Sequence, residues 1–219
     1  MKLYWIKAQA PRRVLALAKH LDLDAELIEL DLRAGDLREP AHATLNPNCK
    51  APTLVDGDLV LWESSAIMAH LCIRAGSSLW PAQNPAEQVQ VLRWLSWNDQ
   101  HWARAVAPYY FELIVKSTFS FGPPDRSGFA AAHVDFMRYA RVLDEHLAHH
   151  GHPACDRLTI ADFQLASMAC DWREAEMPMA GFPHIVRWLD GLMDLPAWRD
   201  PWPVAAASRP LRQPAKEVS

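Results

Sequence analysis

The apolar positions of the first 78 residues switch between strand-like and helix-like spacing. Leu3–Ile6 is a short apolar run that predicts a buried strand. From Pro11 onward apolar residues recur every three or four positions, which predicts a helix. Proline suits its first turn because it has no amide hydrogen to leave unpaired. Ile28, Leu30 and Leu32 alternate with acidic residues and predict a second strand. We therefore expect a mixed α/β unit.

The next stretch predicts a hairpin followed by a helix. Ala51–Val55 is a strand with a proline near its start, where the missing amide donor does no harm. The Asp56-Gly57 pair predicts a tight turn into a second strand, Leu59–Trp62. Hydroxyl residues then precede an apolar run that closes at Gly76, and these are start and stop signals of a helix. Strand backbone beside the anion-binding start of a helix suits a small peptide that carries a carboxylate.

The rest of the chain has helical periodicity. Residues 79–87 have the proline-rich, polar composition of a linker, and residues 88–203 predict an all-helical domain. Pro108 is expected to kink or interrupt the first long helix. Thr159 and Asp162 form a capping box before a strongly apolar segment. Residues 204–219 are polar and are expected to form a flexible tail.

Composition excludes several classes of function. The 219 residues carry a net charge of −4 and no basic run, which disfavours nucleic acid as a partner. Four widely spaced cysteines indicate reduced thiols, and no apolar run reaches the ~20 residues of a membrane helix. We expect a soluble cytoplasmic protein. The histidines at 149, 150 and 152 adjoin Gly151 and Pro153 without a suitably spaced ligand set, so no metal site is predicted.

Three motifs in this order carry a resemblance to a known family. They are Ala51-Pro52, Glu63-Ser64 and the Thr159-x-x-Asp162 capping box. With an α/β unit before a helical one, the chain resembles the cytosolic glutathione transferases over roughly residues 1 to 200. The resemblance implies an α/β thioredoxin-like N-terminal domain followed by an all-α helical-bundle C-terminal domain, in a homodimer.

The resemblance also implies a glutathione site. Pro52 would be a cis proline that exposes the backbone of Ala51 to the cysteinyl part of glutathione. Ser64 would bind the γ-glutamyl carboxylate and Glu63 the α-amino group, while Lys50 could meet the glycine carboxylate. The alternatives are simple helix capping by Glu63 and Ser64, and an ordinary surface lysine at Lys50.

One expected group is missing. The family places a Ser, Tyr or Cys after the first strand, near Ala8 here, to lower the pKa of the glutathione thiol, yet residues 1–43 contain no Ser, Cys or Thr. Ala10 is a poor N-cap, so the first helix has free amides that could stabilise a thiolate, aided by the helix dipole and by Arg12 or Arg13. Gln9 could donate a side-chain hydrogen bond, and Lys7 could supply charge.

The family's second substrate binds between the domains, beside the first long helix of the helical domain. Trp97, His101 and Tyr109 lie on that helix and could form an apolar wall for a hydrophobic electrophile. The alternative is that these side chains pack in the core.

Two functions follow from the resemblance. The first is conjugation of the glutathione thiol to a hydrophobic electrophile, or a related thiol-dependent reduction. The alternative is a non-catalytic protein that binds glutathione or hydrophobic ligands, which the missing hydroxyl favours. A protein-interaction scaffold that binds no glutathione is a third possibility.

Overall fold

A four-stranded mixed sheet forms the N-terminal part of the computed structural model, which describes residues 1–203. The strands lie in the order β2-β1-β3-β4. β1 pairs parallel with β2 and antiparallel with β3, and β3 pairs antiparallel with β4. Their bounds are β1 Lys2–Trp5, β2 Glu26–Glu29, β3 Thr53–Asp56 and β4 Leu59–Trp62.

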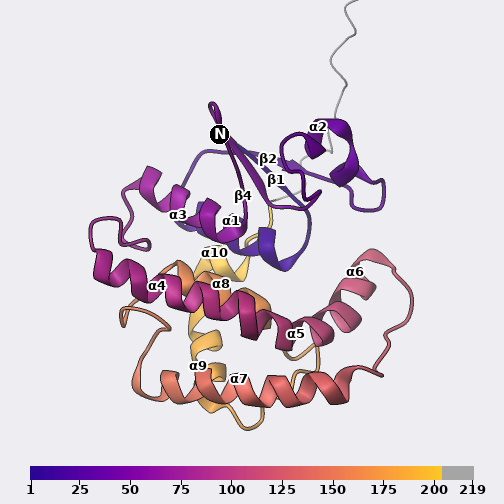
Figure 1. Cartoon of the computed structure of the whole chain (residues 1–219), viewed down its shortest axis with the longest axis vertical. Coiled ribbons are helices and arrows are strands. Elements are labelled where there is room, and N and C mark those ends of the chain that lie inside the picture. The colour runs from indigo at the N-terminus through magenta and orange to yellow at the C-terminus, as the bar shows by residue number, and fades with distance from the viewer. Residues whose placement is uncertain (204–219) are drawn as a thin grey trace, which may run out of the picture.

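Helices pack against the sheet through two apolar clusters. Leu3 and Leu54 face each other in the register of β1 and β3, and they join the main core with α1 and α3. A smaller cluster of Ile6, Leu30 and Leu37 involves η1. Figure 1 shows α1 and α3 between the sheet and the helical part. The bounds of these elements are α1 Gln9–His20, η1 Asp36–Arg38, α2 Pro40–Ala43 and α3 Ser64–Ala75.

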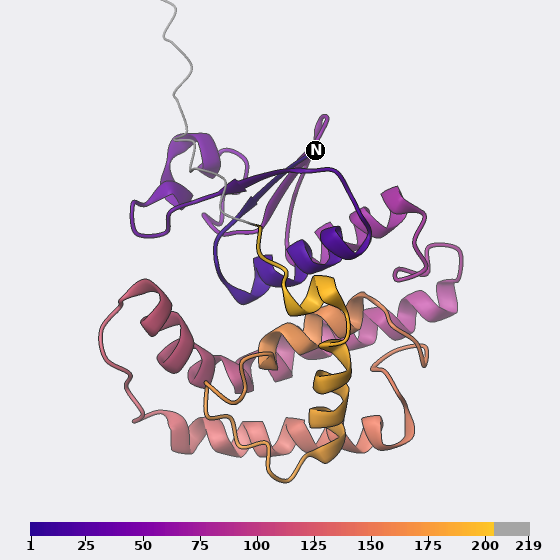
Figure 2. The same ribbon diagram turned by 180° about the vertical axis from the view of Figure 1, so that it is seen from behind.

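The C-terminal part is helical and surrounds one buried helix. Every residue of α8, Ile160–Ala169, is buried, and α8 contacts α1, α4 and α5. Figures 1 and 2 show α4 crossing close to α8, with the long helix α7 on the side of the helical part away from the sheet. The remaining bounds are α4 Pro85–Trp97, η2 Asn98–Trp102, α5 Ala103–Tyr110, η3 Phe111–Val115, α6 Lys116–Phe119, α7 Phe129–His149, α9 Pro183–Leu192 and α10 Pro196–Arg199.

Several predicted features differ from the structure. β1 is Lys2–Trp5 where Leu3–Ile6 was expected, and β3 begins at Thr53 where Ala51 was expected. α1 begins at Gln9, two residues before Pro11. Proline is tolerated at this third helical position because the first four amides of a helix have no partner within the helix. β2 ends at Glu29, before Leu30 and Leu32, because its parallel ladder extends no further than β1. Pro108 lies inside α5, and the helix continues through it into the π-helical turn η3.

The described residues contain neither a membrane span nor a metal cluster. Among residues 1–203 no helix is both long enough and apolar enough to cross a bilayer. The same range has no group of three His, Cys, Asp or Glu side chains placed to hold a metal ion. His150 and His152 instead bond Asp156 and Asp162, one carboxylate each. The predicted flexible tail, residues 204–219, lies outside the described residues.

The predicted capping box is present and is part of a larger network around Asp162. This buried carboxylate accepts hydrogen bonds from the amide of Thr159 at 2.8 Å and its hydroxyl at 3.2 Å. It also accepts from His152 Nδ1 at 2.8 Å and from Trp188 Nε1 at 2.9 Å. Because Trp188 belongs to α9, one carboxylate holds the start of α8, α9 and the loop before α8 together.

The His152–Asp162 contact predicts a pH-dependent stability. The hydrogen bond to Asp162 raises the pKa of His152, so folding favours the protonated imidazole. This contribution is complete below the unfolded pKa of about 6.5 and is lost as pH rises through the raised folded value. His152→Ala should therefore destabilise the protein more at about pH 5.5 than at about pH 8.5 in urea unfolding. The matched control is His149→Ala, since His149 is exposed. An equal loss at both pH values would contradict the assigned coupling.

Candidate functional site

The backbone around Ala51 is the first part of the candidate site. The Ala51–Pro52 peptide is cis, as the resemblance implies. β3 begins only at Thr53, and within residues 1–203 neither the N–H nor the C=O of Ala51 has a hydrogen-bond partner. Ala51 therefore offers one donor and one acceptor to an extended peptide, which could add to the end of β3 as a further strand.

The loop before Ala51 is held through the carbonyl of Lys50. This oxygen accepts from Asn46 Nδ2 at 2.8 Å and from His42 Nε2 at 3.0 Å, which therefore carries the ring hydrogen. The Thr53 hydroxyl donates to it at 3.4 Å. The side chain of Lys50 is exposed. The backbone beside Ala51 is thus fixed from inside the protein, while the cation is left at the surface.

The start of α3 is the second part of the site. Glu63 precedes the helix with a φ of 71°, a strained conformation for a residue with a side chain, and its carboxylate makes no capping hydrogen bond. Ser64 is 7 % exposed, and its hydroxyl has no partner in the described part of the chain. The amides of residues 64–66 are likewise unpaired there. The capping alternative is therefore not what the structure shows, and these donors are available to an anion.

The start of α1 is the third part. Ala8 caps the helix without a side-chain bond, and within residues 1–203 the amides of Gln9 and Ala10 have no partner. The Gln9 side chain donates from Nε2 to the carbonyl of Met168 at 3.1 Å, which holds it against α8. Lys7 is exposed in the loop before the helix. Pro11, the next residue of the helix, has no amide hydrogen, so the free amides of this turn are those of Gln9 and Ala10.

Ala8 and Ala51 border the same small apolar cluster. Both pack against the small cluster of Ile6, Leu30 and Leu37. The start of α1 and the free backbone before β3 therefore border the same part of the molecule.

Arg13 is a buried cation between the two parts of the molecule. It is 5 % exposed, its Nη2 contacts Met168 Sδ at 3.3 Å, and its Nε has no partner within residues 1–203. Burial lowers the pKa of Arg13 to about 10, and the charges of Asp99 and Glu63 oppose that fall. The guanidinium thus contributes positive potential between α3 and the helical part.

Arg12 points toward the helical part. Its Nη2 donates to the carbonyl of Trp198 at 2.8 Å, and its guanidinium carbon lies 4.2 Å from the centre of the Trp198 ring. Trp198 belongs to α10. The sequence suggested that Arg12 or Arg13 assists at the helix start, but the side chain of Arg13 contacts α8 and that of Arg12 contacts α10.

The three predicted pocket residues pack against α7. Trp97 and His101 contact Tyr139, with ring centres 6.2 and 4.8 Å away. Tyr109 packs against Phe129 at 4.8 Å and is buried. These contacts place much of each aromatic surface in the helical core. Their role toward a second substrate stays a prediction.

The chain is similar to known proteins over most of its length. Residues 1–72 match the family model "Glutathione S-transferase, N-terminal domain", and residues 109–196 match "Glutathione S-transferase, C-terminal domain". Glutathione S-transferase 3 from Zea mays is 30 % identical over 194 residues, which are 85 % of this chain and 86 % of the relative. The chain belongs to the glutathione S-transferase family. Its fold, a mixed-sheet domain followed by a helical domain, is the one that the sequence predicts.

Solved structures of family members share the whole fold. Glutathione transferase F7 from Populus trichocarpa superposes with a TM-score of 0.82 at 24 % identity, covering 90 % of this chain and 95 % of that one. The theta class glutathione S-transferase from Xanthomonas axonopodis pv. citri, solved with glutathione bound, gives 0.80 at 28 % identity. That comparison covers 90 % of this chain and 94 % of the other.

Two supporting residues of this family member are not apparent in its sequence pattern. His42 and Asn46 lie in a polar, irregular stretch, and neither belongs to one of the three motifs. Their importance comes from burial, since His42 is 1 % and Asn46 2 % exposed, and both bond the carbonyl of Lys50. An asparagine just before a Pro-Asn turn was the available signal, because such side chains often bond nearby backbone.

Asn46→Ala should lower the free energy of unfolding. The change removes a donor to the Lys50 carbonyl and to the Thr53 hydroxyl, and also the acceptor of the Asn48 amide. Losing such buried hydrogen bonds costs about 1–3 kcal/mol. Urea unfolding measures the loss. Asn48→Ala is the matched control, since the exposed Asn48 gives up only one side-chain hydrogen bond, to Asn46 Oδ1. Equal stability of wild type and Asn46→Ala would show that other contacts hold this loop.

Proposed function

We propose that this protein binds glutathione across the starts of α1, β3 and α3. Three groups of unpaired backbone atoms carry the proposal: those of Ala51, of residues 64–66, and of Gln9 with Ala10. Ala51, Ser64, Gln9 and Ala10 are buried or half-buried, and backbone groups in such positions are usually paired, so these free groups support a polar ligand. A tripeptide supplies matching amides and carboxylates.

The charges of glutathione fit the side chains around these groups. The γ-glutamyl carboxylate binds the Ser64 hydroxyl and the start of α3, where the helix dipole attracts an anion. Glu63 pairs with the α-amino group, and its positive φ sets the direction of its exposed side chain. Ala51, which precedes Pro52, pairs with the cysteinyl backbone, and Lys50 meets the glycine carboxylate.

The proposed reaction is attack of the glutathione thiolate on a hydrophobic electrophile. Only the thiolate is a strong nucleophile, so the site must favour ionisation of a thiol whose ordinary pKa is about 8.5. The free amides of Gln9 and Ala10 are suited to this, and the exposed Lys7 adds positive charge. The Gln9 side chain keeps one amide hydrogen beyond the one that bonds Met168.

The second candidate function is binding without turnover. One observation favours it, since neither a hydroxyl nor a thiol side chain lies in the first helix or in the loop before it. In that case the site would hold glutathione or a hydrophobic ligand without lowering the pKa of a thiol. Titration of bound glutathione separates the two functions.

The proposed assembly is a homodimer. Six large apolar side chains are exposed on β4, α3 and α4, and a second copy packed there would remove them from water. In both views α3 and α4 lie toward the same side of the molecule (Figures 1 and 2). The six residues are Leu59, Val60, Trp62, Ile73, Val89 and Leu92. A cytoplasmic location is part of the proposal and fits the four cysteines, all of which are free thiols.

Ser64→Ala should weaken glutathione binding by about tenfold, because a hydrogen bond to a charged group contributes about 1.5 kcal/mol or more. Calorimetric titration measures the affinity. Ser65→Ala is the matched control, because it removes the neighbouring hydroxyl from the same helix turn. Unchanged affinity of Ser64→Ala would remove Ser64 from the glutathione site.

Amides that hold a thiolate would change the ionisation of the thiol of bound glutathione. If the α1 amides stabilise the thiolate, its pKa in the complex should lie below the free value, as ultraviolet titration of thiolate absorbance measures. Gln9→Pro deletes one amide at a position that proline tolerates, since Ala8 is already extended, and should raise that pKa by about one unit. Gln9→Ala keeps the amide and removes only the side chain.

The two Gln9 variants identify which group acts. A rise with Gln9→Pro alone assigns the effect to the backbone, and an equal rise with Gln9→Ala assigns it to the side chain. A bound thiol with the free pKa in wild type, together with no turnover of a chloro-dinitroaromatic substrate, would support the binding protein.

A further inference from the structure

The last described segment of the chain packs against α1. Residues 196–202 contain α10, and we call them the C-terminal strap. Trp198 of the strap contacts Arg12, the fourth residue of α1. Asp200 contacts Lys19 in the last turn of the same helix, with 3.2 Å between the ammonium and the carboxylate. Two attachments along one helix fix its rotation as well as its position.

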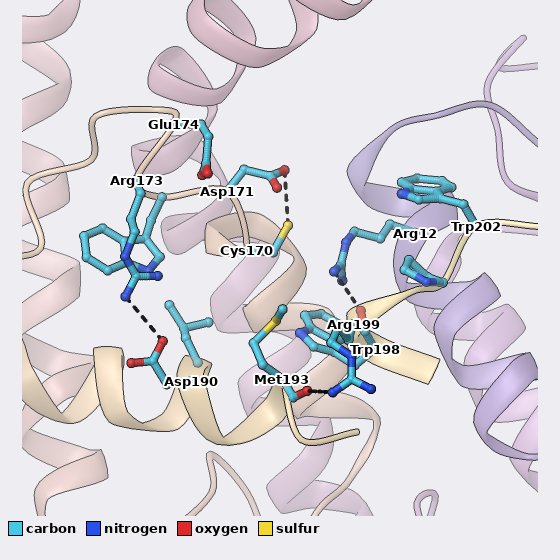
Figure 3. A pocket seen from close by; sticks show the side chains of 13 residues that line it. Arg12, Cys170, Asp171, Arg173, Glu174, Asp190, Met193, Trp198, Arg199 and Trp202 are labelled. Atoms are coloured by element: carbon cyan, nitrogen blue, oxygen red, sulfur yellow. Dashed lines mark hydrogen bonds and ion pairs between the residues drawn. The ribbon is translucent and has the colours of Figure 1, made fainter. Parts of the chain in front are cut away.

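Arg12 is the buried attachment of the strap. Its side chain reaches from α1 to Trp198, where Nη2 donates to the backbone carbonyl at 2.8 Å (Figure 3). The guanidinium carbon also lies 4.2 Å from the centre of the Trp198 ring. That ring is 1 % exposed and packs edge-on against Phe163 of α8. Arg12 is therefore held by a hydrogen bond and by an aromatic ring that is itself fixed in the core.

The backbone of the same residue closes the first turn of α1. The Arg12 amide donates to the carbonyl of Ala8 at 2.9 Å, and within residues 1–203 it is the first paired amide of the helix. The free amides of Gln9 and Ala10 lie inside the turn that this bond closes. In the described chain no side chain caps the turn from its N-terminal side. The direction of the free amides therefore depends on contacts with the helical part.

The chemistry of Arg12 suits the fixing of an orientation. The residue is 8 % exposed, and its Nη1 has no partner within residues 1–203. A buried charge that is only partly paired contributes less stability than an apolar side chain of similar size. A guanidinium can bond a carbonyl and stack on a ring at the same time, whereas the ammonium of a lysine cannot. What arginine adds at this position is a defined geometry.

We propose that Arg12 is a positioning residue, through which the C-terminal strap directs the free amides of Gln9 and Ala10 toward the sulfur of bound glutathione. Arg12 does not touch the ligand and acts through the turn that its own amide closes. The inference rests on the proposed function and deepens it, because it names the part of the helical domain that maintains the thiol end of the site.

Ultraviolet titration of the thiol of bound glutathione tests the positioning role. Arg12→Lys keeps the charge but not both contacts, and it should raise the pKa of that thiol by about half a unit. Lys19→Met is the matched control, because it removes a charge from the exposed end of the same helix, and it should change the pKa by less than about 0.2 units. S-methylglutathione has no free thiol, so both variants should bind it within about twofold of wild type.

Two further variants separate geometry from charge. Arg12→Met removes both, so a raised thiol pKa in Arg12→Met without one in Arg12→Lys would show that charge alone acts and would overturn the proposal. An unchanged pKa in both variants would overturn it as well. If neither Arg12 variant folds, Trp198→Phe leaves the arginine in place and reduces the ring on which it stacks. The thiol pKa should then rise in the same direction, and an unchanged value counts against the positioning role.

Amide hydrogen exchange of the ligand-free protein gives a second readout that does not require glutathione. The amide of residue 12 should exchange at least about tenfold faster in Arg12→Lys than in wild type, while the amides of α8 keep their rates. Equal exchange at residue 12 in the two proteins would overturn the inference. A wild type that binds no glutathione would contradict the proposed function, and the exchange rates would still decide whether the strap holds the first turn of α1.

Discussion

The burial of α1 between the sheet and α8 is the constraint on which the rest of the structure depends. Residues 11–18 of this helix are all buried, and they include two arginines as well as apolar side chains. Gln9 and Arg13 both contact Met168 of α8, while Arg12 contacts α10. One helix therefore fixes the sheet to the helical domain, and its free N-terminus is held in place by that packing.

The candidate glutathione site is consequently made largely of backbone. Ala51, the first turn of α3 and the first turn of α1 all present unpaired amides, and each is held by buried contacts behind it. The loop before Ala51 is one example, because His42 and Asn46 both donate hydrogen bonds to the Lys50 carbonyl. A site of this kind is preorganised, because its dipoles do not need to turn when a charged ligand arrives. The positive φ of Glu63 is local strain that the surrounding structure maintains.

Much of the fold could be predicted because several signals are local. The turn at Gly57, the left-handed stop at Gly76 and the Thr159–Asp162 capping box each depend on residues within one turn of each other. The helix start at Ser64 could be predicted for the same reason, whereas β3 begins at Thr53, two residues after the predicted strand start at Ala51. The exact start of α1 was missed because the first residues of a helix make few bonds that their sequence could reveal.

The sequence by itself determined the order of the elements, the family and the absence of a hydroxyl or thiol side chain near the first helix, since each depends on residue type and short spacing. Tertiary structure alone decided what distant partners do to a side chain. In the folded protein Arg12 is buried with its Nη1 unpaired among the described residues, and the Gln9 side chain donates to Met168. The aromatic side chains of Trp97, His101 and Tyr109 pack against α7. Those outcomes depend on contacts between residues far apart in the chain, which no local pattern encodes.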